Sequence, residues 1–438
     1  MSRLKRMAAV LLGLGACLTL SGCARSVLNY QIAESIGTLG QYENNEPVET
    51  PKMKAEREQE ESEAAVEEQL TSVLDEAENL AEQYEYEEAI SLLQNSDISQ
   101  EDERVTEAIA AYQEALDSMY EYEGDIGHLS FTNLIADTSL AFDGDGNEAT
   151  YDSNMITLSE FQGILQQLYD NGYVLIDIHS LVEETQDENG NVTLTQKNPL
   201  VPQGKKPLIL SVDNLNYSSV VNGDGIATRL TLNDQGEVQA VYTDSEGHDL
   251  TGAYDIVPVL NVFIQEHPDF SLGGARGIIS LSGVNGAFGY DLSEETSASA
   301  QENQDTVRAI AQKLTEDGWQ FACAGYSYTY MSDMSYEGLQ QDITQWKNTI
   351  ESLVGQTDIL MYPYGAEVDY STEKAVYLMD QGFHYFIGTW TEGDHLEVNE
   401  NYLRQTRRMV TGYVFDQLPA NFDQYFSSSQ ILDGDRPR

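Results

Sequence analysis

The chain has 438 residues, which is enough for one large domain and a smaller module. Its 74 acidic and 22 basic residues give a formal net charge of −52 at pH 7. A surface with this charge repels nucleic acid and anionic lipid headgroups, so we expect no nucleic-acid partner. It also disfavours anionic polymers, which leaves neutral or cationic glycans as the polymers that it would bind.

The first 22 residues have the pattern of a bacterial signal peptide. Basic residues precede an apolar stretch from Ala8 to Leu20, which ends in Leu20-Ser21-Gly22-Cys23 and so matches the lipobox. We therefore predict a lipoprotein signal peptide at 1–22 and a lipid anchor on Cys23. This anchor would hold the protein at the extracellular face of the cytoplasmic membrane. The alternative is a plain secretory signal with an incidental cysteine. If Cys23 carries the lipid, Cys323 is left without a disulfide partner.

Two segments precede the large domain. Residues 23–61 are polar and acidic and contain Pro47 and Pro51, a composition that predicts an acidic flexible tether. Residues 62–123 have apolar side chains at helical spacing and predict a helical stalk. Within the stalk, Ala77 to Ile90 resembles one tetratricopeptide (TPR) hairpin. Because stacked arrays need about three repeats, we expect a small TPR-like stalk and no peptide-binding superhelix.

Residues 124–438 alternate between strand patterns and helix patterns. The predicted strands are 128–135, 173–178, 207–214, 277–283, 319–325, 358–365 and 385–390, with 410–414 as a further candidate. The predicted helices are 157–171, 254–266, 305–317, 335–354 and 372–381. This alternation predicts an α/β fold with a parallel sheet, closed into a (β/α) barrel, and places functional residues at the carboxyl ends of the strands. An inserted β-hairpin is expected at 228–231 and 238–243, around Asn233-Asp234-Gln235-Gly236.

Three of these strand ends carry related motifs. They read Leu208-Ile209-Leu210-Ser211-Val212-Asp213-Asn214, Gly318-Trp319-Gln320-Phe321-Ala322-Cys323-Ala324-Gly325-Tyr326-Ser327-Tyr328 and Met361-Tyr362-Pro363-Tyr364-Gly365. Together they resemble the polysaccharide deacetylase family (NodB homology domain, carbohydrate esterase family 4), whose motifs read T-F-D-D, G-H-E-I-G-N-H-T-x-x-H and R-x-P-Y-G. The resemblance covers roughly residues 124–438 and implies the distorted (β/α) barrel of the deacetylase type.

The family's chemistry depends on residue types that this chain lacks. Family members hold a divalent metal with one aspartate and two histidines, and a further aspartate serves as the base. Asp213 falls at the base position, but Asn214, Ala324 and Tyr328 fall at the three ligand positions. Met361 replaces the arginine that braces the base. We therefore predict a degenerate metal site without a cofactor; if catalysis survives, a zinc-like divalent metal is the expected cofactor.

Aromatic residues near the strand ends suggest a second use for this cleft. Tyr326, Tyr328, Tyr364 and Trp390 are predicted to bind a sugar, because aromatic faces suit the apolar faces of pyranose rings. The alternative is ordinary barrel packing with polar tips at the rim.

One acidic loop resembles the opening of a calcium loop. Asp143-Gly144-Asp145-Gly146-Asn147 has alternating acids, but Glu148 and Asn154 occupy positions where such loops have glycine and glutamate. A turn is the favoured interpretation.

These patterns leave three hypotheses open. The favoured one is a surface-anchored, deacetylase-like protein that binds a cell-envelope or environmental glycan, either peptidoglycan or an N-acetylated polysaccharide. The second is an active hydrolase that removes acetyl groups from a glycan with a rearranged site. The third is a protein-interaction scaffold that acts through the helical stalk.

Overall fold

The computed structural model describes residues 50–188, 190–293, 298–389 and 393–437. The chain divides into two compact units, Met1–Glu67 and Glu68–Arg438. The predicted signal peptide, Cys23 and the part of the predicted tether from 23 to 49 lie outside the described residues. Within the described ranges, no helix is both long enough and apolar enough to cross a lipid bilayer.

Helix α2 (Pro51–Glu82) begins inside the segment predicted to be a flexible tether, so that boundary was wrong. Proline is well suited to the first turn of a helix, where its missing N–H is not needed. Opposite charges four residues apart then support the first turns. These pairs are Lys52–Glu56, Lys54–Glu58 and Arg57–Glu61.

The stalk is helical as predicted, and α2 is followed by α3 (Tyr86–Asn95) and α4 (Glu103–Asp117). Its small core consists of five buried residues: Leu70, Ala77, Ala89, Leu93 and Val105. The turn between α2 and α3 contacts the large domain, since the Tyr84 hydroxyl donates to the carbonyl of Asp269 at 2.9 Å. Strand β1 (Tyr120–Glu121) then pairs with β6 (Leu200–Val201).

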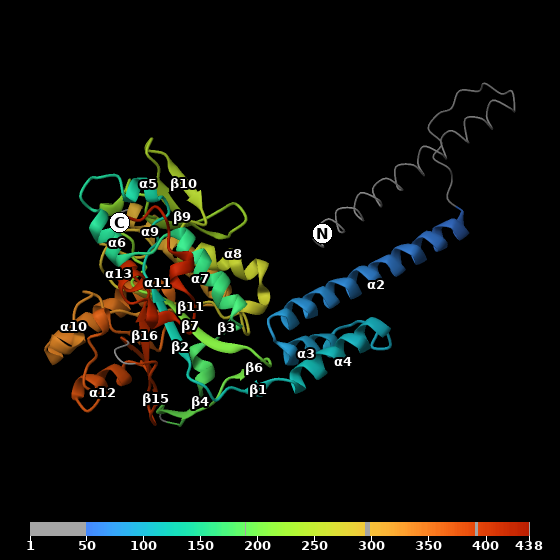
Figure 1. Cartoon of the computed structure of the whole chain (residues 1–438). Helices are drawn as coiled ribbons and strands as arrows, with labels where there is room; N and C mark the ends of the chain where they lie inside the picture. Colours follow the sequence, from blue (N-terminus) through green and yellow to red (C-terminus); the bar gives the residue numbers. More distant parts are fainter. Residues whose placement is uncertain (1–49, 189, 294–297, 390–392, 438) are drawn as a thin grey trace, which may run out of the picture. The chain divides into compact units, whose positions relative to one another are not determined.

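The large domain is built on a closed barrel of seven parallel strands. In order around the barrel the strands are β7 (Lys206–Val212), β2 (Gly127–Phe131), β16 (Leu403–Met409), β14 (Tyr385–Thr389), β13 (Ile359–Met361), β12 (Trp319–Cys323) and β11 (Gly277–Leu281). Pairing of β11 with β7 closes the ring. Figure 1 shows β2, β7, β11 and β16 at the centre of the domain. Strand β3 (Tyr173–Leu175) pairs with the beginning of β7. The predicted barrel is therefore confirmed.

Helices cover the outside of the barrel. They are α7 (Leu158–Asp170), α8 (Ile256–Glu266), α9 (Ala298–Glu316), α10 (Tyr336–Trp346), α11 (Ser352–Val354) and α12 (Glu373–Asp380). Successive residues of a strand face opposite sides, so β7 directs Leu208 and Leu210 into the layer beneath the helices. Ile209 faces the barrel interior, together with apolar residues of the other strands. The same alternation carries Ser211 and Asp213 to the inside.

Two strand predictions need correction. The expected strand at 410–414 is wrong, because the seventh barrel strand is β16 (Leu403–Met409) and the chain turns into helix α13 (Gly412–Gln417). Five of the seven residues of β16 are polar, so the strand has no apolar alternation that would reveal it. The insert contains β8 (Arg229–Leu232) and β9 (Val238–Thr243) as expected, but β10 (Asp249–Gly252) adds a third strand.

Several short elements gave no clear sequence signal. They are α5 (Thr138–Ala141), α6 (Glu148–Asn154), the hairpin β4 (Val182–Gln186) and β5 (Val192–Gln196), β15 (Leu396–Val398) and α14 (Ser428–Ile431). The last residues return to α7, where Arg436 forms two 2.7 Å bonds to the buried carboxylate of Glu160. This ion pair fixes the C-terminal segment to the barrel.

Candidate functional site

The upper half of the barrel interior is polar. His128 of β2 is fully buried, and its ring nitrogens lie 2.8 Å from the Ser211 hydroxyl and 3.1 Å from the Gln405 amide oxygen. The Ser211 hydroxyl donates in turn to that of Ser130. Burial, reinforced by the positive charge of Arg407, lowers the pKa of His128 to about 3. The ring is therefore neutral, and all of its hydrogen-bonding capacity is used within the barrel.

Asp213 lies above this layer, directly after β7, and is 8 % exposed. One carboxylate oxygen accepts a 2.8 Å bond from the Arg407 guanidinium. The other accepts from the Ser280 hydroxyl at 3.2 Å and from the Tyr328 hydroxyl at 3.3 Å. Both oxygens of the residue at the predicted base position are thus engaged by side chains of the protein.

Arg407 provides a guanidinium beside Asp213, which the sequence analysis did not predict. It is 1 % exposed and donates to the carbonyls of Ile387, Gly388 and Tyr362, as well as to Asp213. The carbonyl of Tyr362 follows Met361, the position at which the family resemblance implies an arginine. Met361 itself packs in the apolar interior. A positive charge therefore reaches the base position from β16, a different strand of the barrel.

The three predicted ligand positions follow β7 and β12, the two strands that flank β11 in the barrel. The backbone N–H of Asn214 donates to the Ser280 hydroxyl at 2.7 Å, and its φ of 56° lies in the left-handed region. Ala324 is fully buried, and its N–H donates to the carbonyl of Leu281. Tyr328 places its hydroxyl on Asp213. Burial, and then the charge of Asp213, raise the pKa of Tyr328, so this hydroxyl stays a donor.

These residues do not fit a catalytic metal. The side-chain oxygen of Asn214 is a neutral acceptor, buried and without a hydrogen-bond partner in the described part of the chain. Ala324 has no ligand atom, and the oxygens of Asp213 are engaged as described above. A zinc site needs about four ligands, of which three come from the protein in catalytic sites. The positions around Asp213 provide one free neutral oxygen, so no step is assigned to a metal here.

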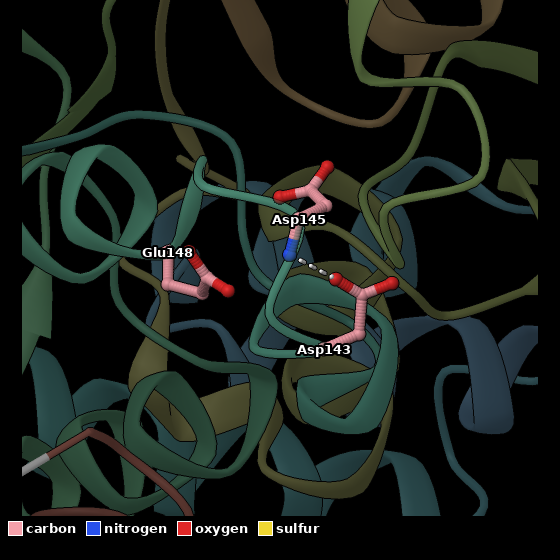
Figure 2. Close-up of side chains that lie close together, drawn as sticks. All are labelled: Asp143, Asp145 and Glu148. Carbon is pink, nitrogen blue, oxygen red and sulfur yellow. Dashed lines mark hydrogen bonds between the residues drawn. The ribbon is translucent and has the colours of Figure 1, made fainter.

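Among the described residues, one group of three metal-type ligands converges elsewhere. Figure 2 shows Asp143 and Asp145, from the loop between α5 and α6, and Glu148, the first residue of α6. Asp143 accepts from the N–H of Asp145 at 3.0 Å, and Glu148 accepts from the N–H of Gly146 at 3.0 Å. Each carboxylate therefore caps the backbone of its own loop, as expected of the predicted turn.

The predicted aromatic residues separate into two places. The ring centroids of Tyr328 and Tyr330 lie 5.1 Å and 5.0 Å from that of Tyr364. Tyr330 and Tyr364 are 51 % and 58 % exposed. Tyr326 instead lines a groove beside α10, and Trp390 lies outside the described residues. We call Tyr328, Tyr330 and Tyr364 the tyrosine cluster.

The tyrosine cluster has an unusual backbone. Tyr328 has a φ of 50° and Tyr364 a φ of 54°, values that bulky side chains rarely adopt. Such conformations cost roughly 1–3 kcal/mol each and persist where the surroundings fix them. The loop that precedes Tyr328 is held by Asp342, whose carboxylate accepts hydrogen bonds from the backbone N–H groups of Tyr326 and Ser327.

Comparison with known families agrees with this architecture. Residues 294–385 match the family model described as polysaccharide deacetylase. This segment is related to the polysaccharide deacetylases. It contains two of the three motifs, at β12 and β13, and the resemblance inferred from those motifs is confirmed. The match does not extend to Asp213. No curated protein matches the chain.

Solved structures with a related fold have low similarity. The Streptococcus pyogenes deacetylase PplD, in complex with acetate, is 11 % identical with a TM-score of 0.37, covering 67 % of this chain and 94 % of that one. A de-N-acetylase from Aggregatibacter actinomycetemcomitans is 11 % identical with a TM-score of 0.40, covering 69 % and 100 %. BA3943, a CE4 family pseudoenzyme from Bacillus anthracis, is 10 % identical with a TM-score of 0.22, covering 41 % and 60 %. These values are too low to transfer the role of any residue.

Sequence reasoning missed three residues of the site. Arg407 and Ser280 complete the surroundings of Asp213, and Tyr330 extends the tyrosine cluster. Arg407 alternates with Gln405 and Leu403 on one face of β16, so assigning that strand correctly would have placed it inside the barrel. Ser280 occupies an inward position on β11 that an apolar pattern does not single out.

Proposed function

We propose that this protein is a surface-anchored, polysaccharide-deacetylase-like protein that binds an acetylated glycan and does not hydrolyse it. The observation that carries the proposal is the full engagement of Asp213 by Arg407, Ser280 and Tyr328. A general base must be free to accept a proton from water. An arginine partner alone is compatible with a base, because the resemblance implies one in active family members. What sets Asp213 apart is that the hydroxyls of Ser280 and Tyr328 occupy its other oxygen.

The tyrosine cluster supports glycan binding. Tyr330 and Tyr364 present exposed rings beside the covered Asp213, and their faces suit the C–H faces of pyranose rings. Tyr328 and Tyr364 both have left-handed backbones, and such conformations cluster at binding and catalytic sites. The ligand in this proposal is peptidoglycan or another N-acetylated polysaccharide. The Cys23 lipid anchor would place the barrel at the extracellular face of the membrane, close to such polymers.

Isothermal titration of the full chain with chito-oligosaccharides and peptidoglycan fragments tests binding. We expect heat with at least one glycan, and a roughly tenfold weaker affinity for Tyr364→Ala, because removing one aromatic contact costs about 1 kcal/mol or more. The matched control is Tyr413→Ala, an exposed tyrosine of α13 outside the cluster. Absence of heat with every glycan would remove the sugar-binding claim.

The loss of catalysis is tested separately. Metal analysis of the purified protein and an acetate-release assay on the same glycans distinguish a binding protein from the hydrolase hypothesis. We expect no stoichiometric zinc, cobalt or nickel and no released acetate. A bound transition metal together with acetate release would favour the hydrolase.

A further inference from the structure

A second polar surface lies beside the barrel, on the helix that follows the tyrosine-bearing loop. Helix α10, the π-helical turn η5 (Lys347–Glu351) and α11 form one continuous helical segment. Along one side it carries Glu337, Gln341, Gln345, Asn348 and Ser352, spaced by three or four residues and therefore on one face. We call this set the amide face. It lacks lysine and arginine and has a single acid, in a chain with 74 acidic residues.

The amide face forms one wall of a groove of about 790 Å³. Gln304 of α9 lies on another side, and Tyr326 of the loop after β12 also lines it. This volume is within the range of small-molecule sites, about 300–1,000 Å³. Glu337 is the one charged side chain among the described residues that line the groove. The groove is therefore suited to an uncharged polar ligand.

The amides of this face are free to bind a ligand. Several glutamines of other helices donate a hydrogen bond to a carboxylate four residues later. Examples are Gln113 to Asp117, Gln166 to Asp170, Gln301 to Asp305 and Gln312 to Glu316. On the amide face, the residues four positions after Gln341, Gln345 and Asn348 are Gln345, Thr349 and Ser352. In the part of the chain that the structure describes, these three amide side chains make no hydrogen bond.

The wall of the groove is held rigidly. The indole N–H of Trp346, on the opposite side of the helix, donates to the carbonyl of Leu281 at 2.7 Å. Asp342 accepts the N–H groups of Tyr326 and Ser327 at 2.8 and 2.9 Å, which ties the helix to the loop. The π-helical turn contains Asn348 and Thr349, and such turns are frequent at functional sites. Rigid elements with fixed supports position binding groups precisely.

We propose that this groove is a carbohydrate-binding site for an uncharged N-acetylated oligosaccharide. Each free amide offers both a donor and an acceptor, which match sugar hydroxyls and acetamide groups. Tyr326 supplies an aromatic face at one end, and its ring is packed so closely on Gly283 that a Cβ there would lie 2.2 Å from it. The proposal goes beyond the function of the tyrosine cluster and does not depend on it.

The test is isothermal titration of the full chain with chitohexaose, comparing the parent with Q341A/Q345A/N348A and with Tyr364→Ala. All three amide positions are exposed, so we expect the triple variant to fold. It should lose the affinity of the groove by roughly ten- to thirtyfold, because about two neutral hydrogen bonds are removed. Gln94→Ala is the matched control, an exposed helical glutamine of α3 outside the groove, and should bind like the parent.

The outcomes separate this proposal from the preceding one. If both sites bind, the parent shows two classes of site, and each variant removes one of them. If only the groove binds, Tyr364→Ala has no effect and the triple variant alone shows the weakened affinity. Parent-like titration of the triple variant would overturn the groove proposal, as would absence of chitohexaose binding to the parent.

Discussion

The pairing of Asp213 with Arg407 makes the sharpest prediction about the barrel. The two side chains are 7 % and 1 % exposed and are joined by a 2.8 Å bond. Replacing Arg407 with methionine would leave the carboxylate buried, with only the hydroxyls of Ser280 and Tyr328 as partners. Asp213→Asn is less disruptive, because asparagine keeps an oxygen acceptor and Arg407 keeps three carbonyls.

The magnitudes follow from this asymmetry. Breaking a buried ion pair by removing one partner costs about 3–5 kcal/mol, so Arg407→Met should lower the unfolding temperature by about 6–10 °C at about 2 °C per kcal/mol. We expect Asp213→Asn to cost about 1–3 kcal/mol, as for a weakened buried hydrogen bond. In the double variant no unpaired charge remains, so its loss should be smaller than the sum of the single losses.

Urea unfolding of the parent, the two single variants and the double variant measures this coupling. A coupling energy of about 1–3 kcal/mol is expected for charges in direct contact. A coupling energy near zero would show that Arg407 does not stabilise the buried carboxylate of Asp213. The proposal of a non-catalytic site would then lose its main support. Acetate release by the Arg407→Met variant, absent in the parent, would instead indicate that the carboxylate had been blocked but remained competent.

Three further predictions concern buried and partly buried charges. His128 has a pKa near 3 in the fold and an ordinary value of 6.5, so stability should fall as pH falls between these values, by up to about 1.4 kcal/mol per unit; His128→Gln should flatten this limb in urea titrations. Burial opposes charge on His179, but its hydrogen-bonded carboxylates outweigh it and raise its pKa to about 10. Its contribution should therefore be complete below pH 6.5 and lost by pH 10, and His179→Gln should remove that loss. Arg436→Met should cost about 3–5 kcal/mol in thermal unfolding, because Glu160 stays buried, whereas Arg308→Met on the surface should cost less than about 1 kcal/mol; equal losses would contradict this reasoning.

The sequence was sufficient to predict the barrel strands that are apolar. Six of the seven barrel strands follow apolar runs, such as the one that ends at Asp213, and each was predicted within a few residues. Strand β16 was missed because Arg404, Gln405 and Arg407 interrupt the apolar pattern. That error also concealed the partner of Asp213, since the contact joins residues 194 positions apart.

Tertiary contacts also determine which surface each tyrosine of the site faces, and the sequence did not predict this. The motif at 318–328 places Tyr326 and Tyr328 in one loop, and it gives no sign that the two rings serve different surfaces. Their separation follows from the left-handed backbone at Tyr328 and from the anchoring of the loop by Asp342. Neither feature is visible in a residue pattern. The amide face could have been read from the spacing of Gln341, Gln345 and Asn348, although their freedom from other contacts required coordinates.

The pairing of the buried arginines bears on the electrostatic charge of the protein's outer surface. Arg404, Arg407, Arg408 and Arg436 are each bound to a carboxylate in a shielded position, so these pairs are neutral and do not reduce the acidic excess of the chain. The negative charge is therefore carried by the outer surface, which attracts a cloud of small cations from the solution. That cloud thins over about 8–10 Å at physiological ionic strength. At low ionic strength, electrostatic repulsion should therefore keep copies of the protein apart from one another and from polyanions. At high ionic strength this repulsion should be screened.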